Sequence, residues 1–536
     1  MKMHRIAAAA LALALVPAGL LLAAGEVDSG TAAAEDRLAA VGFATAGYPI
    51  VDTPITVQAM IRGAAHVHYE FDEMTLIVDL QERSNIDLVF ETVPGAQVSE
   101  KRNLIFASRE YPDLMLNMGV SDRNLWGAAQ AGDVWALDEM IDAHAPNWKQ
   151  AFVERPIVRK AITQPDGKIY SLPYYREILN DYGIRDTMAI NVDWLSKMGI
   201  DKIPDTTEEF YQALKAFRTG IDNGTLPENG VPWLGRFHAW GNGGEWELYN
   251  AFALWMKGQG VGAEKYLSVN DGVVEFGATD PKLKDAVKFL HRLFSEGLIT
   301  EEFFTNQGTD FTPRSRSVPP ISGYWGSYFI TAPVEEFYDP LPPLMGPTGV
   351  RRYRSQPVRL QKNAFTIFSK FEYPEALVRF IDPWADDTFS IEASYGGPLI
   401  RQEADGTRTV TGRGVDWFEH GPHNFFPTYV SKRAADKVNW TGEQGFRDLY
   451  IREIYSPYIW PQERHFAYIT YTDEEQEELA VSSTEIADYI KTSIANWMVD
   501  GGVDEDWDDY LKELDRLGLD QVMEIFQTAY DRFHGN

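Results

Sequence analysis

The segment GKIYSLPYYREI (167–178) decides the fold of this chain. It begins like a turn and then places Tyr174, Tyr175 and Arg176 side by side directly after Pro173. Proline has no backbone N–H and cannot donate a hydrogen bond to a sheet ladder. The sequence therefore raises the question of why two phenols and a guanidinium follow such a residue in a soluble protein.

Length and composition bound the answer. The chain has 536 residues, which is more than one hydrophobic core usually supports, so we expect two or three folding units. The formal charge of -30 argues against nucleic acid and anionic membrane surfaces as partners, and it disfavours a polyanionic ligand such as a uronate polymer. The chain contains no cysteine, which excludes disulfides, thiol catalysis and thiolate metal sites.

The first residues have the pattern of an export signal. Basic residues precede an unbroken apolar run over residues 6–24, and small residues follow. We interpret residues 1–34 as a signal peptide and linker, which predicts an extracellular or cell-surface protein. Gly25 stands where a bacterial lipoprotein carries its lipidated cysteine. A lipid anchor needs that thiol, so the sequence favours a released or surface-located protein over a lipid-anchored one.

Hydrophobic periodicity predicts an α/β fold. Residues 54–62 and 85–94 have the β-branched pattern of strands, and a short buried strand ends at Gly119, with helical segments between them. This alternation is typical of a parallel sheet flanked by helices. Amphipathic helices are expected over residues 205–220 and 280–297, and the chain from Thr484 onward is helical and acidic.

Signatures of metal, phosphate and catalytic sites are absent from the sequence. It contains no GxxxxGK[ST], HExxH or G-x-S-x-G pattern, and we predict neither a cofactor nor a metal. The segment TGIDNGTLPENG (219–230) is acidic and glycine-rich like a calcium-binding loop. It lacks the alternating oxygen ligands of such a loop, so a turn-rich connection is favoured. Adjacent acidic pairs such as Glu208-Glu209 are interpreted as solvated faces. Glu245, set among aromatic residues, is the best candidate for a catalytic acid.

Aromatic residues are dense in glycine-rich surroundings. The chain carries 15 Trp and 25 Tyr, and several lie in stretches such as GYWGS (323–327) and YGGP (395–398). Large rings usually belong to the core. Beside glycine, however, a flat ring can also cover the apolar face of a sugar, while neighbouring polar groups bind its hydroxyls. Core packing and sugar binding both remain open for these rings.

Several segments together resemble one family. They are PDGKIYSLPY (165–174), RDTMAINVDWLSKMGIDKIPDTTEEFYQALKAF (185–217), ASYGGP (393–398) and the helical end over residues 496–533. The chain resembles the family-1 extracellular solute-binding proteins of bacterial ABC importers, and more narrowly their large lipoprotein-type subgroup associated with oligosaccharides. The resemblance covers about residues 49–533.

The resemblance implies a type II two-lobed α/β fold. Each lobe would be a mixed sheet flanked by helices, with extra C-terminal helices. The N-terminal lobe would comprise residues 50–172 plus 366–415, and the C-terminal lobe residues 173–365 plus 416–536. Leu172-Pro173 would then be the first crossover between the lobes, and KNAFTIF (362–368) would be the return crossover.

The resulting hypothesis is a monomeric binding protein that is not an enzyme. It would capture an oligosaccharide between its lobes and deliver it to the permease of an ABC importer. The side chains expected to line the ligand site are Trp126, Tyr174, Tyr175, Arg176, Trp240, Trp246, Tyr324, Trp325, Trp384 and Tyr395. The alternatives are a peptide-binding protein of the same fold, a secreted glycoside hydrolase that uses Glu245, and an acidic surface protein without a small ligand.

Overall fold

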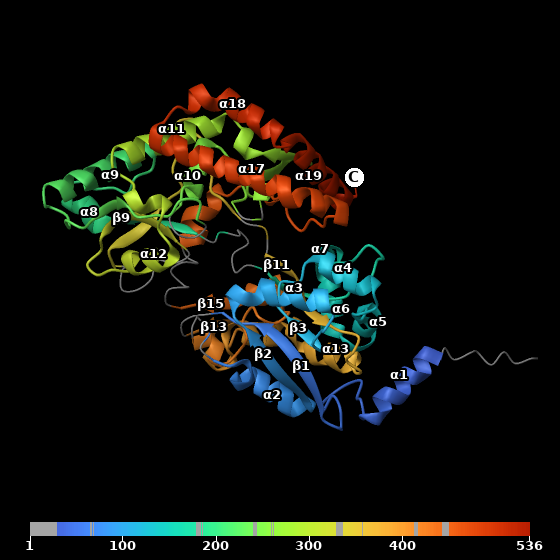
Figure 1. The fold of residues 1–536 in the computed structure, drawn as a ribbon. Coiled ribbons are helices and arrows are strands. Elements are labelled where there is room, and N and C mark those ends of the chain that lie inside the picture. The colour runs from blue at the N-terminus through green and yellow to red at the C-terminus, as the bar shows by residue number, and fades with distance from the viewer. Residues whose placement is uncertain are drawn as a thin grey trace, which may run out of the picture.

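The chain forms two lobes in a computed structural model (Figure 1). The first lobe contains the N-terminal elements, and the second contains the middle of the chain and the red C-terminal helices, with strand β11 between them. The structure describes residues 29–64, 67, 69–177, 184, 186–239, 244–258, 260, 262–327, 336–355, 357, 359–411, 416–441 and 450–535. The predicted export signal lies almost entirely outside these residues. No helix in the described ranges is both long and apolar enough to cross a membrane.

A six-stranded mixed sheet forms the centre of the first lobe. Its order is β14-β4-β11-β3-β1-β2; β1 is parallel to β2 and β3, whereas β11 is antiparallel to β3 and β4. The strands are β1 (Ile55–Arg62), β2 (Ile86–Val93), β3 (Leu114–Leu116), β4 (Leu172–Arg176), β11 (Arg359–Ile367) and β14 (Tyr429–Val430). The predicted strands over residues 54–62 and 85–94 are thus confirmed as β1 and β2.

Helices and a small second sheet surround these strands. The helices are α1 (Ser29–Ala40), α2 (Thr75–Ser84), α3 (Val98–Ser108), α4 (Asp122–Gln130), α5 (Asp138–His144), α6 (Pro146–Glu154), α7 (Pro156–Ile162), α13 (Pro374–Ile381), α14 (Asp387–Tyr395) and α15 (Lys432–Ala435). The small sheet consists of β12 (Ile400–Gln402), β13 (Arg408–Val410) and β15 (Val438–Trp440). Figure 1 places this small sheet on the side of the first lobe that faces the second.

The second lobe has a four-stranded sheet of order β10-β5-β9-β6 and a separate β-hairpin. The strands are β5 (Thr187–Asn191), β6 (Val231–Trp233), β7 (Leu267–Asn270), β8 (Val273–Phe276), β9 (Ser322–Ser327) and β10 (Tyr338–Leu341). Its helices are α8 (Val192–Lys197), α9 (Thr207–Asp222), α10 (Trp246–Tyr249), α11 (Lys282–Ser295), α12 (Gly308–Ser315), α17 (Asp473–Asp500), α18 (Val503–Arg516) and α19 (Leu519–His534).

Side-chain caps explain where the predicted helices begin. At the start of α9, Thr206 Oγ1 accepts a hydrogen bond from the backbone N–H of Glu209 at 3.1 Å, and Glu209 accepts one from the backbone of Asp205 at 2.8 Å. At the start of α11, Asp280 accepts one from the backbone of Lys282 at 2.9 Å. These bonds satisfy amide donors that have no partner within the helix. The two helices confirm the predicted segments to within two residues at each end.

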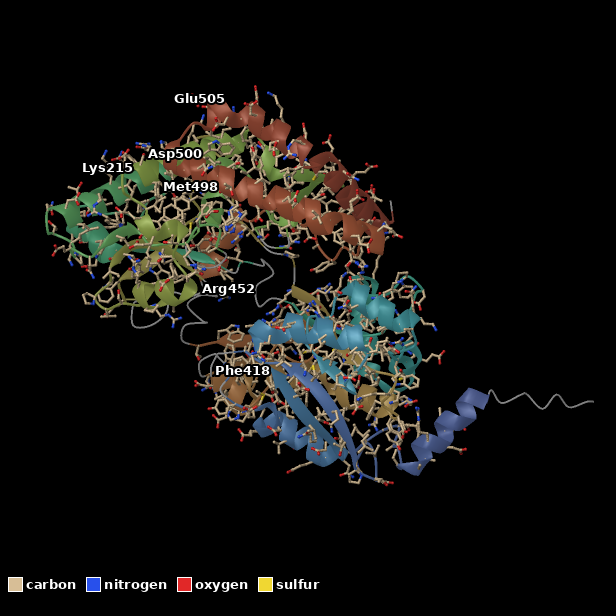
Figure 2. The ribbon with its side chains drawn as sticks, in the orientation of Figure 1. Lys215, Phe418, Arg452, Met498, Asp500 and Glu505 are labelled. Carbon is tan, nitrogen blue, oxygen red and sulfur yellow. The ribbon has the colours of Figure 1, made fainter. Side chains whose placement is uncertain are left out.

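The two lobes have separate hydrophobic cores. Phe418 belongs to the core around the six-stranded sheet, and Met498 belongs to the core of the second lobe (Figure 2). Buried residues of the segment 417–435 therefore pack with the first lobe, although the sequence-based division placed residues 416–536 with the second. The cause is β14, which adds to the edge of the six-stranded sheet beside β4. The predicted lobe boundaries otherwise stay a prediction.

Candidate ligand-binding site at the crossover strands

The strands β4 and β11 form a ribbon that extends beyond the sheet of the first lobe. Phe365 of β11 pairs with Leu116 at the end of β3 and also with Leu172 at the start of β4. Beyond this point the two strands continue past the carboxyl end of β3, with residues 174–176 of β4 paired to residues 359–361 of β11. Ligands of open α/β sheets bind at this edge, so the ribbon is the natural place for a binding site.

One face of the ribbon combines two arginines with two tyrosines. Arg359 pairs directly with Arg176 across the strands, so the two side chains share a face. The guanidinium of Arg176 lies 4.5 Å from the ring centre of Tyr395, and that of Arg359 lies 5.1 Å from the ring centre of Tyr174. The hydroxyl groups of both tyrosines are buried and have no hydrogen-bond partner among the described residues.

Amide side chains continue this polar face toward the sheet. Gln361 pairs with Tyr174 across the ribbon and donates a hydrogen bond to the side chain of Asn117. Asn117 directly follows β3, has a left-handed backbone with φ of 50°, and donates to the carbonyl of Asn424 at 2.9 Å. Sequence reasoning missed Asn117, Arg359 and Gln361. The one pattern in the sequence that could have indicated a site is at Asn117, a polar residue that directly follows a buried strand and shortly precedes Gly119.

The opposite face of the ribbon is anchored in the core of the first lobe. The ring of Tyr175 stacks on Tyr429 with centres 5.2 Å apart, and its hydroxyl donates to the buried carboxylate of Glu177 at 2.9 Å. Arg155 donates to the same carboxylate at 2.5 Å. Burial and the charge of Glu177 raise the pKa of Tyr175 far above its ordinary value. These contacts of Tyr175 hold the ribbon in place against the core of the first lobe.

An aromatic cluster surrounds Tyr395 at the edge of the first lobe. Its ring contacts Trp417 and Trp440 in edge-to-face geometry, with centres 5.1 and 4.6 Å apart. Trp440 lies at the end of β15 and is half-buried. Edge-to-face contacts of this kind fix ring orientation. The YGGP segment, of which Tyr395 is the first residue, is thus brought next to Arg176 by tertiary structure.

A bulge in β11 ties the ribbon to both lobes. The register of β11 shifts between Gln361 and Phe365, and Asn363 there has a φ of 55°. The bulge lets the ammonium of Lys362 reach Asp122 at 3.0 Å and Thr470 at 2.8 Å. Asp122 begins α4 of the first lobe, and Thr470 precedes α17 of the second. Bulges re-aim side chains in this way, and this one makes Lys362 a tie between the lobes.

A buried ion cluster holds the second-lobe ends of both crossover segments. Arg354 donates to Glu247 at 2.7 Å and to Asp186 at 3.4 Å, and all three side chains are buried. Asp186 lies directly before β5, and Arg354 shortly before β11. Burial, opposed by the charge of Arg354, raises the pKa of Glu247 to about 7. The cluster fixes the two crossovers to one point of the second lobe.

The comparison with known proteins agrees with this geometry. Residues 68–382 match the family of bacterial extracellular solute-binding proteins. The chain belongs to this family. It is 29% identical over 462 residues to the fructooligosaccharide ABC transporter substrate-binding protein FusA of Streptococcus pneumoniae serotype 4, which covers 82% of this chain and 83% of FusA.

Solved structures share the fold of this solute-binding protein. FusA of Streptococcus pneumoniae in complex with kestose superposes with a TM-score of 0.76 at 25% identity, covering 90% of this chain and all of that one. An HMO-binding solute-binding protein from Bifidobacterium longum infantis superposes with a TM-score of 0.75 at 23% identity, covering 89% of this chain and 99% of that one. The type II two-lobed α/β fold predicted from the sequence is confirmed.

Most of the predicted site residues of this solute-binding protein are buried, Tyr174 and Tyr395 among them. Tyr324 contacts Trp233 and Phe210 in the second lobe, and Trp384 contacts Phe389 and Phe426 in the first. Tryptophans 246 and 325 are also buried, and the half-buried Trp126 lies one helical turn after Asp122 on α4. Trp240 lies outside the described residues. The structure thus brings together Tyr174, Arg176 and Tyr395, and the ligand role of all ten residues stays a prediction.

Glu245, the candidate acid of the hydrolase alternative, is fully buried in the second lobe. Its two oxygens lie 2.9 Å from the ring nitrogen Nδ1 and from the backbone nitrogen of His238. The other ring nitrogen of His238 lies 2.9 Å from the hydroxyl of Tyr266. A general acid must reach the substrate within hydrogen-bond distance. Glu245 is instead enclosed in a structural network.

The segment 219–230 comprises the last turn of α9 and the connection that follows it, and two of its side-chain oxygens have partners close by in the chain. Asp222 forms an ion pair with Arg218 at 2.7 Å, and Asn223 accepts a hydrogen bond from the backbone of Thr225 at 3.0 Å. Within the described ranges no group of three or more His, Asp or Glu side chains is placed to hold a metal ion. These contacts are those of the turn-rich connection favoured from the sequence.

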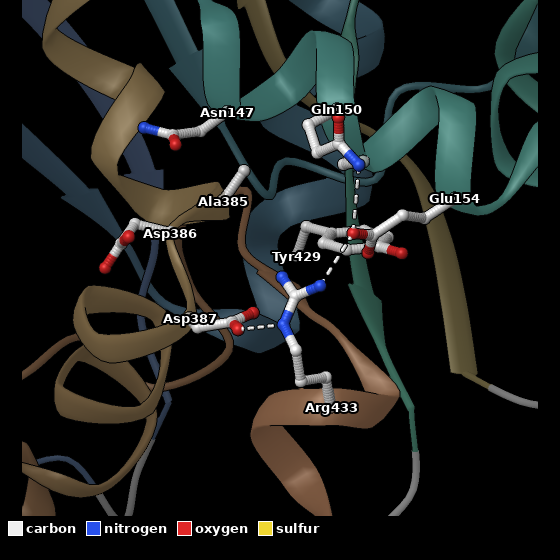
Figure 3. Close-up of a pocket in the computed structure, with 9 residues that line it drawn as sticks. Asn147, Gln150, Glu154, Ala385, Asp386, Asp387, Tyr429 and Arg433 are labelled. Atoms are coloured by element: carbon white, nitrogen blue, oxygen red, sulfur yellow. Dashed lines mark hydrogen bonds and ion pairs between the residues drawn. The ribbon is translucent and has the colours of Figure 1, made fainter.

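Two pockets lie outside the polar face of the ribbon. The first, of about 100 Å³, is crossed by Arg433, which bonds Asp387 at 2.5 Å and Glu154 at 3.0 Å (Figure 3). Ligand pockets usually measure roughly 300–1,000 Å³, so this one is too small. The second, of about 450 Å³, lies beside the start of α9 in the second lobe, next to the ion pair of Glu208 and Arg292. No lining residue of either pocket belongs to β4 or β11.

Proposed function

We propose that this protein is the substrate-binding component of an ABC importer that captures an oligosaccharide between its lobes. The observation that carries the proposal is the crossover ribbon, which presents two guanidinium groups, each stacked on a buried tyrosine ring, at the carboxyl edge of the sheet. The name of FusA and its complex with kestose support a sugar ligand. Delivery to a permease and export from the cell follow from the family.

Binding without cleavage is the chemistry that these residues support. The side chains at the ribbon are tyrosine, arginine, glutamine and asparagine, which bind hydroxyl groups but supply no pair of carboxylates for glycoside hydrolysis. The buried position of Glu245 opposes the hydrolase alternative. We therefore propose that the protein is not an enzyme and acts as a monomer whose ligand leaves chemically unchanged.

Closure of the lobes would couple binding to transport. A ligand that contacts both lobes only when they approach each other stabilises the closed state by its difference in affinity for the two states. The tie at Arg354 holds both crossovers to one point of the second lobe, and the tie at Lys362 joins β11 to both lobes. We place the bending of the crossovers between these two ties. The permease would then recognise the closed state of the protein.

Calorimetric titration of the exported form, from residue 35 onward, tests the proposed function. We expect saturable binding of kestose or another short oligosaccharide, and small-angle scattering should show a more compact protein when it is saturated. Chromatography of the recovered sugar should show no shortened product. Absence of binding across a broad panel of oligosaccharides, together with binding of peptides, would refute the proposal.

A further inference from the structure

The two arginines of the ribbon form a positive centre without a carboxylate partner. Arg176 and Arg359 face each other directly across β4 and β11, and no ion pair to either side chain exists within the described residues. Glu177, which follows Arg176 in the chain, accepts hydrogen bonds from Arg155 and Tyr175 instead. Like charges placed directly opposite each other destabilise a strand pair. Such a pair of like charges, in a chain of formal charge -30, points to a purpose outside folding.

The two guanidinium groups at this centre can only donate hydrogen bonds. A guanidinium carries five N–H donors and no acceptor. Beneath the two guanidinium groups lie the rings of Tyr174 and Tyr395, whose hydroxyls are buried and have no hydrogen-bond partner in the described part of the chain. A neutral sugar hydroxyl can accept from a guanidinium but leaves its charge uncompensated, whereas a carboxylate, sulfate or phosphate accepts through several oxygens and also neutralises the charge.

Stacking on the tyrosine rings prepares the two arginines for such a ligand. Each guanidinium lies over a ring whose own position is fixed, Tyr174 by the strand and Tyr395 by its contacts with Trp417 and Trp440. A planar fork held in this way loses little freedom when it binds a planar or tetrahedral anion bidentately. Arg359 is exposed and Arg176 is half-buried. Their N–H donors are therefore accessible to a ligand at the end of the ribbon that extends beyond β3.

We infer that Arg176 and Arg359 form a subsite for a single anionic group carried by the ligand, so that the transported oligosaccharide is an acidic one. This inference rests on the proposed oligosaccharide-binding function and names the ligand class for the same site. One carboxylate, sulfate or phosphate group is enough, and a polyanionic chain is not required.

Thermal unfolding with simple anions tests the subsite directly. Sodium glucuronate, sulfate and phosphate are each titrated at constant ionic strength against sodium chloride, and the three arms separate a sugar carboxylate from the inorganic anions. We expect at least one of them to raise the melting temperature of the wild type with saturation. The double variant R176Q/R359Q should weaken that apparent affinity at least tenfold. If no anion stabilises the wild type, or if the double variant responds equally, the subsite does not exist.

Two further variants keep the result interpretable. R352Q changes an exposed arginine that lies 5.7 Å from the ring centre of Trp460, outside the ribbon, and should respond like the wild type. R176K/R359K keeps both charges but loses the planar fork, so it is used if the glutamine variant does not fold, and it should bind the anions more weakly than the wild type. An equal response of R176K/R359K would contradict bidentate recognition.

Calorimetric titration with oligosaccharides distinguishes failure of this inference from failure of the proposed function. Trigalacturonate and its methyl ester have the same chain but differ in charge, and kestose is neutral. Stronger binding of kestose than of any acidic sugar, with the same affinity in R176Q/R359Q, would leave the proposed function intact and overturn the anionic subsite. Failure of every sugar would refute the proposed function, while the anion titration still decides whether the subsite exists.

Discussion

The ammonium of Lys362 lies 2.8 Å from the hydroxyl oxygen of Thr470 and 3.0 Å from a carboxylate oxygen of Asp122. Lys362 lies in a strand of the first lobe, and Thr470 precedes the long helix α17 of the second. A single side chain therefore spans the junction between the lobes, and its removal should lower the stability of both lobes.

Replacing Lys362 by methionine should lower the free energy of unfolding by about 1–2 kcal/mol. The side chain is half-buried and loses an ion pair together with two further acceptors. Because Lys362 lies outside the proposed ligand contacts, the affinities of all ligands should change by the same factor. Urea denaturation and calorimetry measure both effects. The control Lys370→Met removes an exposed lysine 3.5 Å from Asp113 and should change stability by less than about 0.5 kcal/mol.

Replacing Glu247 by glutamine should change how stability depends on pH. Burial raises the pKa of Glu247 from its ordinary 4.5 to about 7 in the folded protein. Between these values the unfolded chain has released this proton while the folded chain retains it, so stability falls as pH rises. Relative to E247Q, the wild type should lose about 3 kcal/mol across this window and change little outside it.

Urea denaturation at a series of pH values measures this difference. The variant Glu301→Gln changes an exposed carboxylate of the same lobe and serves as the matched control, with a pH profile that should run parallel to that of the wild type. Parallel profiles for the wild type and E247Q would show that Glu247 does not titrate differently in the folded protein.

Replacing Tyr395 by phenylalanine should leave stability within about 0.5 kcal/mol, because its hydroxyl has no hydrogen-bond partner in the described structure. If that hydroxyl donates to a bound ligand, affinity falls by about 2- to 10-fold. The control Tyr455→Phe removes a buried hydroxyl that donates to the carbonyl of Leu341 at 2.6 Å, and it should cost about 1–3 kcal/mol. A large stability loss in Y395F would place its hydroxyl in the fold instead.

Replacing Trp384 by alanine should lower the free energy of unfolding by about 3–5 kcal/mol. The ring is fully buried between Phe389 and Phe426, and its loss leaves a cavity in the first core. Chemical denaturation measures the loss, and calorimetry on the folded fraction should show an unchanged ligand affinity. The half-buried Trp126 provides the comparison, with a smaller stability loss on W126A. Loss of ligand affinity in W384A at full stability would support its predicted site role.

Much of the architecture was accessible from the sequence because it depends on local patterns. Alternating apolar residues marked β1 and β2, and capping residues marked the starts of α9 and α11. The family resemblance predicted the two crossovers in the segments around Pro173 and Lys362. The ring environments were harder to predict. A tyrosine beside glycine has the same local signature whether a guanidinium covers its buried ring, as at Tyr395, or its ring packs among other aromatic rings, as at Tyr324.

The sequence by itself determined the α/β class and the two-lobed family, and it predicted the first crossover at Leu172-Pro173. These properties follow from hydrophobic periodicity and from short motifs, both of which are local in the sequence. Only the tertiary structure decided that Arg176 meets Arg359 and Tyr395, and that 417–435 pack with the first lobe. Such contacts join segments far apart in the chain, and their geometry is set by strand register and by a bulge that no local pattern specifies.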